Sequence, residues 1–389
     1  MRHFFCLFCR GNIPSGWLTG FRMNHLRRVT IKHYIMRKYF SPVLLCLVLL
    51  SCTQTERFMK PKKLILMIGD GMGVAQVYAG MTANKGSLNM ERCTYTGFHK
   101  TYSSNAYITD SGAGGTAIAT GVKTYNGAIG VDSLGNPVTS ILELAEKNGM
   151  ATGLIATSTI THATPAAFIA HQSSRNSYED IALDFTKTDV EVIIGGGLYH
   201  FSRREDGQDL TNIFAAKGYH VLKSVKELSE VSSGKVLCLA DSFHLPPAAM
   251  GRGDMLPVAT EQALRLLNQY KKGFFMMVEG SQIDWGCHEN STDYVVSEVL
   301  DFDDAVGKAL DFARKDGQTL VVITADHETG GMALTGGDIR AGKVEASYTS
   351  EDHTGVMVPV FAFGPGAELF TGVYQNTDLF LKMKEALGL

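Results

Sequence analysis

The stretch Lys63-Leu-Ile-Leu-Met-Ile-Gly-Asp-Gly71 places five apolar residues directly before a Gly-Asp-Gly turn. A continuous apolar run bounded by glycine is typical of a strand that is buried on both faces. Similar runs recur along the chain and alternate with helical patterns, which predicts an α/β fold: a large, mostly parallel central sheet with helices on both faces. We expect strands at 63–68, 151–157, 190–194, 274–278, 319–324 and 358–363, and helices at 139–148, 259–271 and 293–314.

Carboxylates stand where three of these strands end. Asp70 follows the first strand, Glu279 follows the strand at 274–278, and Asp326 follows the strand at 319–324. The carboxyl edge of an open α/β sheet is where ligands bind. Because three carboxylates at one edge repel each other unless cations neutralise them, the pattern favours a metal site.

Histidines accompany these carboxylates. His327 directly follows Asp326, and Asp284 and His288 are four residues apart, which places them on one face of a helical turn. His353 precedes the last predicted strand. Imidazole and carboxylate ligands without thiolate suit Zn²⁺ that keeps an open coordination position. Each histidine alone is more typical of an ordinary hydrogen-bonded side chain, but their joint placement favours a metal centre.

A serine lies in a run of small residues, Asp110-Ser-Gly-Ala-Gly-Gly-Thr-Ala117. If a helix opens here, Ser111 lies at its positive end, where an anion is stabilised. The alternative is a plain N-cap in a glycine-rich turn. The chain contains neither a Gly-x-Ser-x-Gly elbow nor a Walker loop, which disfavours a serine-hydrolase triad and a P-loop NTPase.

A third group of polar residues is His162-Ala-Thr-Pro, which contains Thr164, followed by Arg175 in Ser-Ser-Arg-Asn. A single arginine is usually a surface charge. Its planar guanidinium can nevertheless hold two oxygens of a phosphate at once, which lysine cannot do.

The N-terminal 51 residues are interpreted as a leader, with translation starting at Met36. Met36-Arg-Lys38 precedes an apolar run at 42–50, which is too short to span a bilayer and ends at Ser51-Cys52. Leu49-Leu-Ser-Cys52 resembles a bacterial lipobox, which would make Cys52 a lipidated N-terminus; the alternative is an ordinary cleaved signal. We therefore expect a periplasmic or outer-surface protein, lipid-anchored at Cys52, with a linker at 52–61 and a single catalytic domain at 62–389.

Composition and charge limit the possible partners of that domain. The chain is 45% hydrophobic, as a globular protein with a sizeable core requires. Eight of the 36 Lys and Arg residues lie in the leader, before residue 52, and none of the 39 Asp and Glu residues does. The rest of the chain therefore has 28 basic and 39 acidic residues, a net charge of −11. A body this acidic is not expected to bind nucleic acid. Residues 200–257 are the least patterned and are expected to be an insertion near the rim.

Six motifs in one order resemble those of alkaline phosphatases: Gly69-Asp-Gly-Met-Gly73, Thr109-Asp-Ser-Gly-Ala-Gly-Gly-Thr-Ala117, His162-Ala-Thr-Pro, Val278-Glu-Gly-Ser-Gln-Ile-Asp284, Thr324-Ala-Asp-His327 and His353-Thr-Gly355. The resemblance covers roughly residues 62 to 370. It implies a first zinc on Asp284, His288 and His353. A second zinc would bind Asp70, Asp326 and His327, with Ser111 as its reacting ligand. A third metal, Mg²⁺, would bind Asp70, Thr164 and Glu279.

The same resemblance implies hydrolysis of small phosphate monoesters. Ser111 would be the nucleophile and form a phosphoserine, Arg175 would hold the phosphate oxygens, and the two zinc ions would stabilise the attacking and departing oxygens together. Because the ligand histidines must be neutral, activity should rise toward alkaline pH. A homodimer is also expected, since relatives commonly form one.

Two positions depart from the pattern of many bacterial relatives. His162 stands where they carry Asp, and Trp285 stands where they often carry Lys. A histidine beside the third metal makes that site softer, so Zn²⁺ or Co²⁺ could replace Mg²⁺. Loss of a lysine near the phosphate should weaken product binding and speed product release.

Two other functions are weighed against this one. A phosphodiesterase of the same superfamily resembles the two-zinc site, but it typically uses Thr as the nucleophile and lacks both the arginine and the third metal. A non-catalytic metal- or phosphate-binding lipoprotein would lack a ligand or the nucleophile, and none is missing here. A sulfatase would need a Cys/Ser-x-Pro-x-Arg context, which Ser111-Gly-Ala lacks.

Overall fold

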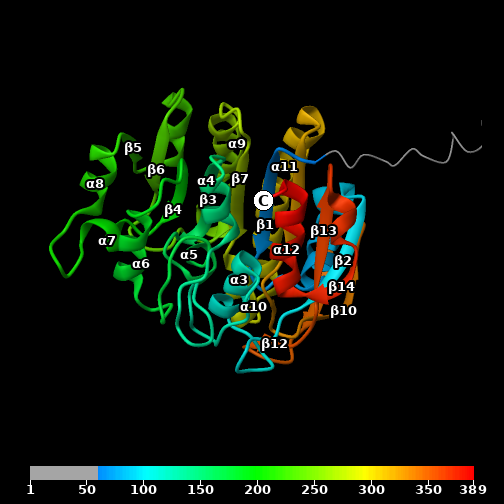
Figure 1. The fold of residues 1–389 in the computed structure, drawn as a ribbon. Helices are drawn as coiled ribbons and strands as arrows, with labels where there is room; N and C mark the ends of the chain where they lie inside the picture. The colour runs from blue at the N-terminus through cyan, green and yellow to red at the C-terminus, as the bar shows by residue number, and fades with distance from the viewer. Residues whose placement is uncertain (1–59) are drawn as a thin grey trace, which may run out of the picture. The chain divides into compact units, whose positions relative to one another are not determined.

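The computed structural model describes residues 60–389, and one sheet of ten strands runs through them (Figure 1). The leader, the start at Met36 and the lipobox cysteine lie outside the described residues. In order across the sheet the strands are β14 (Gly372–Gln375), β2 (Tyr95–Lys100), β13 (Val358–Phe363), β8 (Thr319–Thr324), β1 (Lys63–Gly69), β7 (Phe274–Gly280), β3 (Ala151–Thr159), β4 (Val192–Gly196), β6 (Lys235–Leu239) and β5 (Tyr219–Leu222).

The sheet is parallel except at one strand. β13 runs antiparallel to both of its neighbours, β8 and β2, and every other neighbouring pair is parallel. This confirms the predicted mostly parallel α/β sheet. The carboxyl ends of β1, β7, β8 and β3 consequently meet at one edge, near the middle of the sheet.

Both faces of the sheet are covered by helices because the central strands are apolar on both sides. In β1, Ile65 and Met67 pack into one core, while Leu64, Leu66 and Ile68 pack into the other. The first core is covered by α2 (Val74–Ala83), α9 (Met255–Leu267) and α11 (Thr292–Asp316). The second core is covered by α3 (Ser111–Thr120), α4 (Ile141–Lys147), α6 (Tyr178–Phe185), α8 (Leu210–Ala216) and α12 (Asn376–Leu387).

Short elements complete the fold. They are α5 (Ala163–Ala166), α7 (Leu198–Ser202), α10 (Gln282–His288), the hairpin of β10 (Ala333–Asp338) with β11 (Lys343–Ser347), the two-residue pair β9 (Glu328–Thr329) and β12 (His353–Thr354), and the 3₁₀ turns η1 (Asn89–Arg92), η2 (Val225–Glu230), η3 (Ala248–Met250) and η4 (Ala367–Phe370). No helix within residues 60–389 is long and apolar enough to cross a membrane. Cys93, Cys238 and Cys287 are all unpaired.

The predicted elements are present, with shifted ends in places. The helix predicted at 259–271 is α9, which begins four residues earlier; Pro257 is tolerated because the first turn of a helix needs no donor from its amides. The helix predicted at 139–148 is α4, whose capping box of Ser140 and Glu143 sets its start.

Residues 200–257 do not form the expected insertion at the rim. They supply α8, β5 and β6, and both strands belong to the central sheet, where β6 pairs with β4 and β5 closes the edge. The strands are only five and four residues long. So short a run gives little periodic signal, which is why the sequence pattern missed them.

A buried ion-pair cluster joins the loop before α9 to helix α11. The Arg252 guanidinium contacts Glu298 and lies 2.8 Å from Asp301, and all three side chains are at most 8% exposed. Removing one partner of such a cluster leaves an uncompensated buried charge.

We therefore expect Arg252→Met to lower the free energy of unfolding by about 3 to 5 kcal/mol. Urea unfolding followed by circular dichroism would measure this. Lys308→Met is the matched control, because Lys308 lies on α11 with Glu298 and Asp301 but forms an exposed pair with Glu261. This substitution should change the free energy of unfolding by about 1 kcal/mol or less. Equal effects of the two substitutions would contradict a role of this cluster in stability.

Candidate metal centre

Three neighbouring strands deliver the three predicted carboxylates to one edge of the sheet. Asp70 follows β1 directly, Glu279 is the next-to-last residue of β7 and pairs with Ile68, and Asp326 stands two residues after β8. All three are fully buried. α3, α5, α10 and β12 gather at this edge, at the lower end of the sheet in Figure 1.

His327 lies at the middle of the site. Its Nε2 is 3.4 Å from Asp70 Oδ1 and 3.3 Å from Asp326 Oδ2, and the three residues form a group close enough to hold one cation. Burial lowers the pKa of His327, and the neighbouring His353 lowers it further. The imidazole is therefore neutral, as a metal ligand must be.

The predicted first-zinc residues come from α10 and β12. Asp284 and His288 share one face of α10, as their spacing predicts, with 3.3 Å between Asp284 Oδ2 and His288 Nε2. His353 Nε2 lies 3.5 Å from Asp284 Oδ1 and 3.2 Å from His288 Nε2. His327 also joins this neighbourhood, because its ring stacks on that of His353 at 3.6 Å between centroids.

The buried oxygens of the site have the properties of unsatisfied metal ligands. Both carboxylate oxygens of Asp70, together with Asp326 Oδ2, Glu279 Oε1 and Thr164 Oγ1, are buried without a hydrogen-bond partner. Burial raises the pKa of Asp70, Glu279 and Asp326, and repulsion between neighbouring carboxylates raises it further. Buried charges persist only when they are paired or bind metals, so the residues fit a set of cations.

Ser111 is the first residue of helix α3, so the predicted helix opening is present. The N-cap is Asp110 rather than Ser111: its side chain accepts a hydrogen bond from Ala113 N at 2.9 Å. This leaves the serine hydroxyl available, and Ser111 Oγ lies 3.2 Å from His327 Nε2. The glycines of α3 permit this approach, since a Cβ on Gly114 would lie 3.2 Å from the Asp326 carbonyl oxygen.

Arg175 is held beside the serine by the same cap. Its Nη1 donates to Asp110 Oδ2 at 2.9 Å, and its Nη2 lies 3.3 Å from His162 Nε2. Burial alone would raise the pKa of Asp110, but the guanidinium and the Ala113 amide hold it below its usual value. The carboxylate is thus charged and fixes the arginine next to the N-terminus of α3.

His162 groups with Asp70 and Glu279, and their ligand atoms lie close enough to share an ion. It directly precedes α5, the short helix that carries Thr164, and its side chain makes no capping hydrogen bond. Burial lowers the pKa of His162 to about 3, and the nearby Arg175 contributes to this shift. His162 is therefore neutral, and its Nδ1 has no hydrogen-bond partner.

Three residues at the site were not identified from the sequence. Asp110 caps the helix and holds Arg175, as described above. Thr329 Oγ1 donates to Asp284 Oδ1 at 2.5 Å and lies 3.2 Å from His327 Nδ1, so it joins two ligand groups. His244 packs edge-on against Trp285 at 4.7 Å between ring centroids. The sequence did offer a signal for two of them: Asp110 directly precedes Ser111, and Thr329 stands two residues after His327. Nothing in the sequence marks His244.

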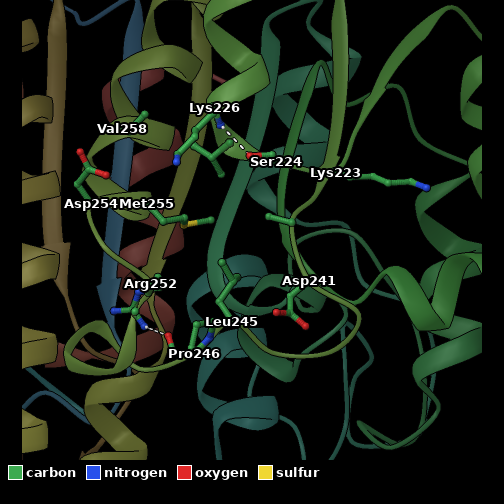
Figure 2. A pocket seen from close by; sticks show the side chains of 13 residues that line it. Lys223, Ser224, Lys226, Asp241, Leu245, Pro246, Arg252, Asp254, Met255 and Val258 are labelled. Atoms are coloured by element: carbon green, nitrogen blue, oxygen red, sulfur yellow. Dashed lines mark hydrogen bonds between the residues drawn. The ribbon is translucent and has the colours of Figure 1, made fainter.

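A separate cavity of about 480 Å³ lies at the carboxyl ends of β5 and β6, beside the first turn of α9 (Figure 2). Lys226, Asp241, Arg252 and Met255 are among the residues that line it. No residue predicted for the metal centre lines this cavity, and its arginine is engaged by Glu298 and Asp301. The cavity is therefore distinct from the metal centre.

Comparison with known proteins gives one consistent family. The family model described as alkaline phosphatase matches residues 61–345 and 337–389. Alkaline phosphatase 4 of Bacillus subtilis (strain 168) is 37% identical over 402 residues, covering 82% of this chain and 87% of that protein.

Solved structures agree with the sequence relatives. The alkaline phosphatase of the Antarctic bacterium TAB5 superposes with a TM-score of 0.82 at 40% identity, over 85% of this chain and 99% of that one. A His-to-Asp variant of that enzyme, with Mg bound in its M3 site, superposes with a TM-score of 0.81 at 40% identity over the same shares of the two chains. The chain therefore belongs to the alkaline phosphatase family and is a metal-dependent phosphomonoester hydrolase.

Proposed function

We propose that the reaction passes through a phosphoserine on Ser111. The observation that carries this proposal is the position of Ser111 Oγ, at the N-terminus of α3 and 3.2 Å from His327 Nε2, among oxygens that lack hydrogen-bond partners. The helix N-terminus favours the negative charge that develops when the hydroxyl attacks. A serine in this environment is suited to nucleophilic catalysis.

The proposed sequence has two displacements at phosphorus. Ser111 Oγ attacks the phosphate and the alcohol of the ester leaves, and water then attacks the phosphoserine, releases inorganic phosphate and restores the hydroxyl. Arg175 holds two non-bridging oxygens through both steps, since Asp110 fixes its guanidinium beside the serine. Because each in-line displacement inverts phosphorus, the overall reaction retains configuration.

The metals are assigned to three residue sets. Two Zn²⁺ ions would be held by Asp284, His288 and His353 and by Asp70, Asp326 and His327. A third ion, Mg²⁺, would be held by Asp70, Thr164 and Glu279, with His162 close enough to take part. When bound, these cations would supply Lewis-acid stabilisation of the phosphate oxygens and lower the pKa of the serine hydroxyl.

The two alternatives account for fewer of the observations. A phosphodiesterase would not need an arginine fixed by a partly buried carboxylate beside the nucleophile, nor a third group of buried ligands. A non-catalytic binding lipoprotein would not need the serine hydroxyl to be left free by the Asp110 cap. The complete set of groups supports the monoesterase.

Ser111→Ala is expected to reduce hydrolysis of p-nitrophenyl phosphate at least about a thousandfold, the scale of losing a covalent nucleophile. The measurement is the steady-state rate of the metal-loaded protein between pH 7 and 10. Ser297→Ala serves as the matched control, because Ser297 donates to a backbone carbonyl on α11, away from the site.

The same assay separates the competing functions. Chelation should abolish turnover by the unsubstituted protein, and bis-p-nitrophenyl phosphate should be hydrolysed far more slowly than the monoester. A faster diesterase would favour the phosphodiesterase. No turnover by the folded, metal-loaded protein would contradict catalysis altogether.

His162→Asp is expected to raise the affinity of the third site for Mg²⁺ about tenfold or more, because a carboxylate is a harder ligand than imidazole. Chelated protein would be titrated with Mg²⁺, and the rise in melting temperature and in activity would be recorded. His220→Asp is the control, since His220 is exposed on β5. An unchanged preference among Mg²⁺, Zn²⁺ and Co²⁺ would contradict the role of His162.

The leader pattern supports export to the periplasm or outer surface with a lipid anchor at Cys52, and fatty-acid labelling that persists in Cys52→Ala would exclude that anchor. A homodimer is supported by exposed apolar side chains near His353, which contacts the Thr109 carbonyl. Tyr102, Tyr107 and Met357 line one surface pocket, and Ile108 and Val356 are exposed next to them in the chain. A monomeric mass in sedimentation would exclude the dimer.

A further inference from the structure

A run of aromatic and imidazole rings leads from the site to the protein surface. It begins at His162, whose ring meets those of His244 and Trp285 edge-on at 5.8 and 6.1 Å between centroids. Beyond His244 stands its neighbour Phe243, which stacks on Tyr199 at 4.8 Å and an interplanar angle of 28°. Tyr199, Phe243 and His244 together form a surface that we term the aromatic platform.

The inner end of this run touches the phosphate-binding group. His162 Nε2 lies 3.3 Å from Arg175 Nη2, so the first ring is a direct neighbour of the guanidinium. Trp285 belongs to α10, the helix that carries Asp284 and His288. The platform is thus continuous with the metal centre.

The outer end of the run is exposed apolar surface. Phe243 is 49% exposed and Tyr199 43% exposed, and His244 is also exposed. Large rings are normally buried, so adjacent exposed rings that lead into a site indicate a binding surface.

The platform is held rigidly in place. Gly197 N donates to the Asp241 carbonyl oxygen at 3.0 Å, and Tyr199 N donates to that of Ser242 at 2.9 Å. A Cβ on Gly196 would lie 1.9 Å from the Phe243 carbonyl oxygen, so the loop packs directly on the end of β4. The His200 ring contacts both Tyr199 and Phe243 edge-on, at 5.8 Å between centroids in each case, and itself stacks on Tyr178 at 4.8 Å. Rings fixed in this way lose little entropy when a ligand stacks on them.

We propose that the aromatic platform binds the base of nucleoside monophosphate substrates. This inference rests on the phosphomonoesterase function proposed above. Two rings come between Arg175 and the outer pair: His162, which contacts the guanidinium, and then His244, which contacts His162. Tyr199 and Phe243 stand further out, so a ligand that stacks on them needs a spacer between phosphate and ring, and the sugar of a nucleotide is such a spacer. Stacking on a base requires no particular hydrogen-bond pattern, so the preference would extend to several bases.

The test compares two substrates in the metal-loaded protein. Steady-state kcat/KM is measured for adenosine 5′-monophosphate and for glycerol 3-phosphate, which has no ring, in the unsubstituted protein and in the double variant Tyr199→Ala/Phe243→Ala. In the double variant, kcat/KM for adenosine 5′-monophosphate divided by kcat/KM for glycerol 3-phosphate is expected to fall about five- to tenfold. The fall should come mainly from a higher KM for the nucleotide, and its size is that of one aromatic contact. Tyr95→Ala is the matched control, because this exposed tyrosine lies on β2, near the opposite end of the strand order, and the ratio should not change.

Further arms separate the possible outcomes. Ribose 5-phosphate contains the sugar without the base, so its kcat/KM relative to that of glycerol 3-phosphate should be the same in the unsubstituted protein and in the double variant. An unchanged nucleotide ratio, or an equal fall for ribose 5-phosphate, would overturn the proposal. Phe243→Leu keeps the apolar volume without the ring and provides the same test should the double variant not fold. Turnover of glycerol 3-phosphate by the unsubstituted protein reports the phosphomonoesterase separately, so failure of the platform and failure of the enzyme are distinguishable.

Discussion

Buried carboxylates repel one another at one edge of the sheet, and the rest of the site must compensate for that repulsion. Asp70, Glu279, Asp284 and Asp326 are all buried, and desolvation and mutual repulsion raise the pKa of three of them. Only Asp284 departs from this: burial alone would raise its pKa, but the surrounding histidines lower it. Such a cluster is costly unless positive charge is supplied locally. Arg175 supplies part of that positive charge, and the proposed cations would supply the rest.

The elements around the cluster are arranged to meet this demand. The strands that carry three of the carboxylates, β8, β1 and β7, are adjacent, so their carboxyl ends meet where helices from both sides can reach them. Helix α3 approaches closely because its first turns contain glycine, and it presents the serine and its positive end together. Catalytic geometry and charge compensation therefore follow from one packing arrangement.

The sequence predicted the central part of this arrangement well. Apolar strands ending on Asp70 and Asp326, and the spacing of Asp284 and His288, are local patterns that the fold preserves. Strand β2 was missed because its side chains alternate between buried and exposed and include polar residues, and β5 and β6 are too short to give a periodic signal. Thr329 and His244 could not be assigned, since their roles arise from contacts with residues 45 and 41 positions away along the chain, Asp284 and Trp285.

The cap on helix α3 has a consequence for how this enzyme can change. Asp110 accepts from the Ala113 and Gly127 amides while it binds the Arg175 guanidinium, so one carboxylate sets both the start of the helix that carries Ser111 and the position of Arg175. A substitution there would disturb both at once. Engineering at Asp110 therefore cannot adjust the proposed nucleophile Ser111 and the proposed phosphate-binding Arg175 separately, because a change of this carboxylate reaches both residues.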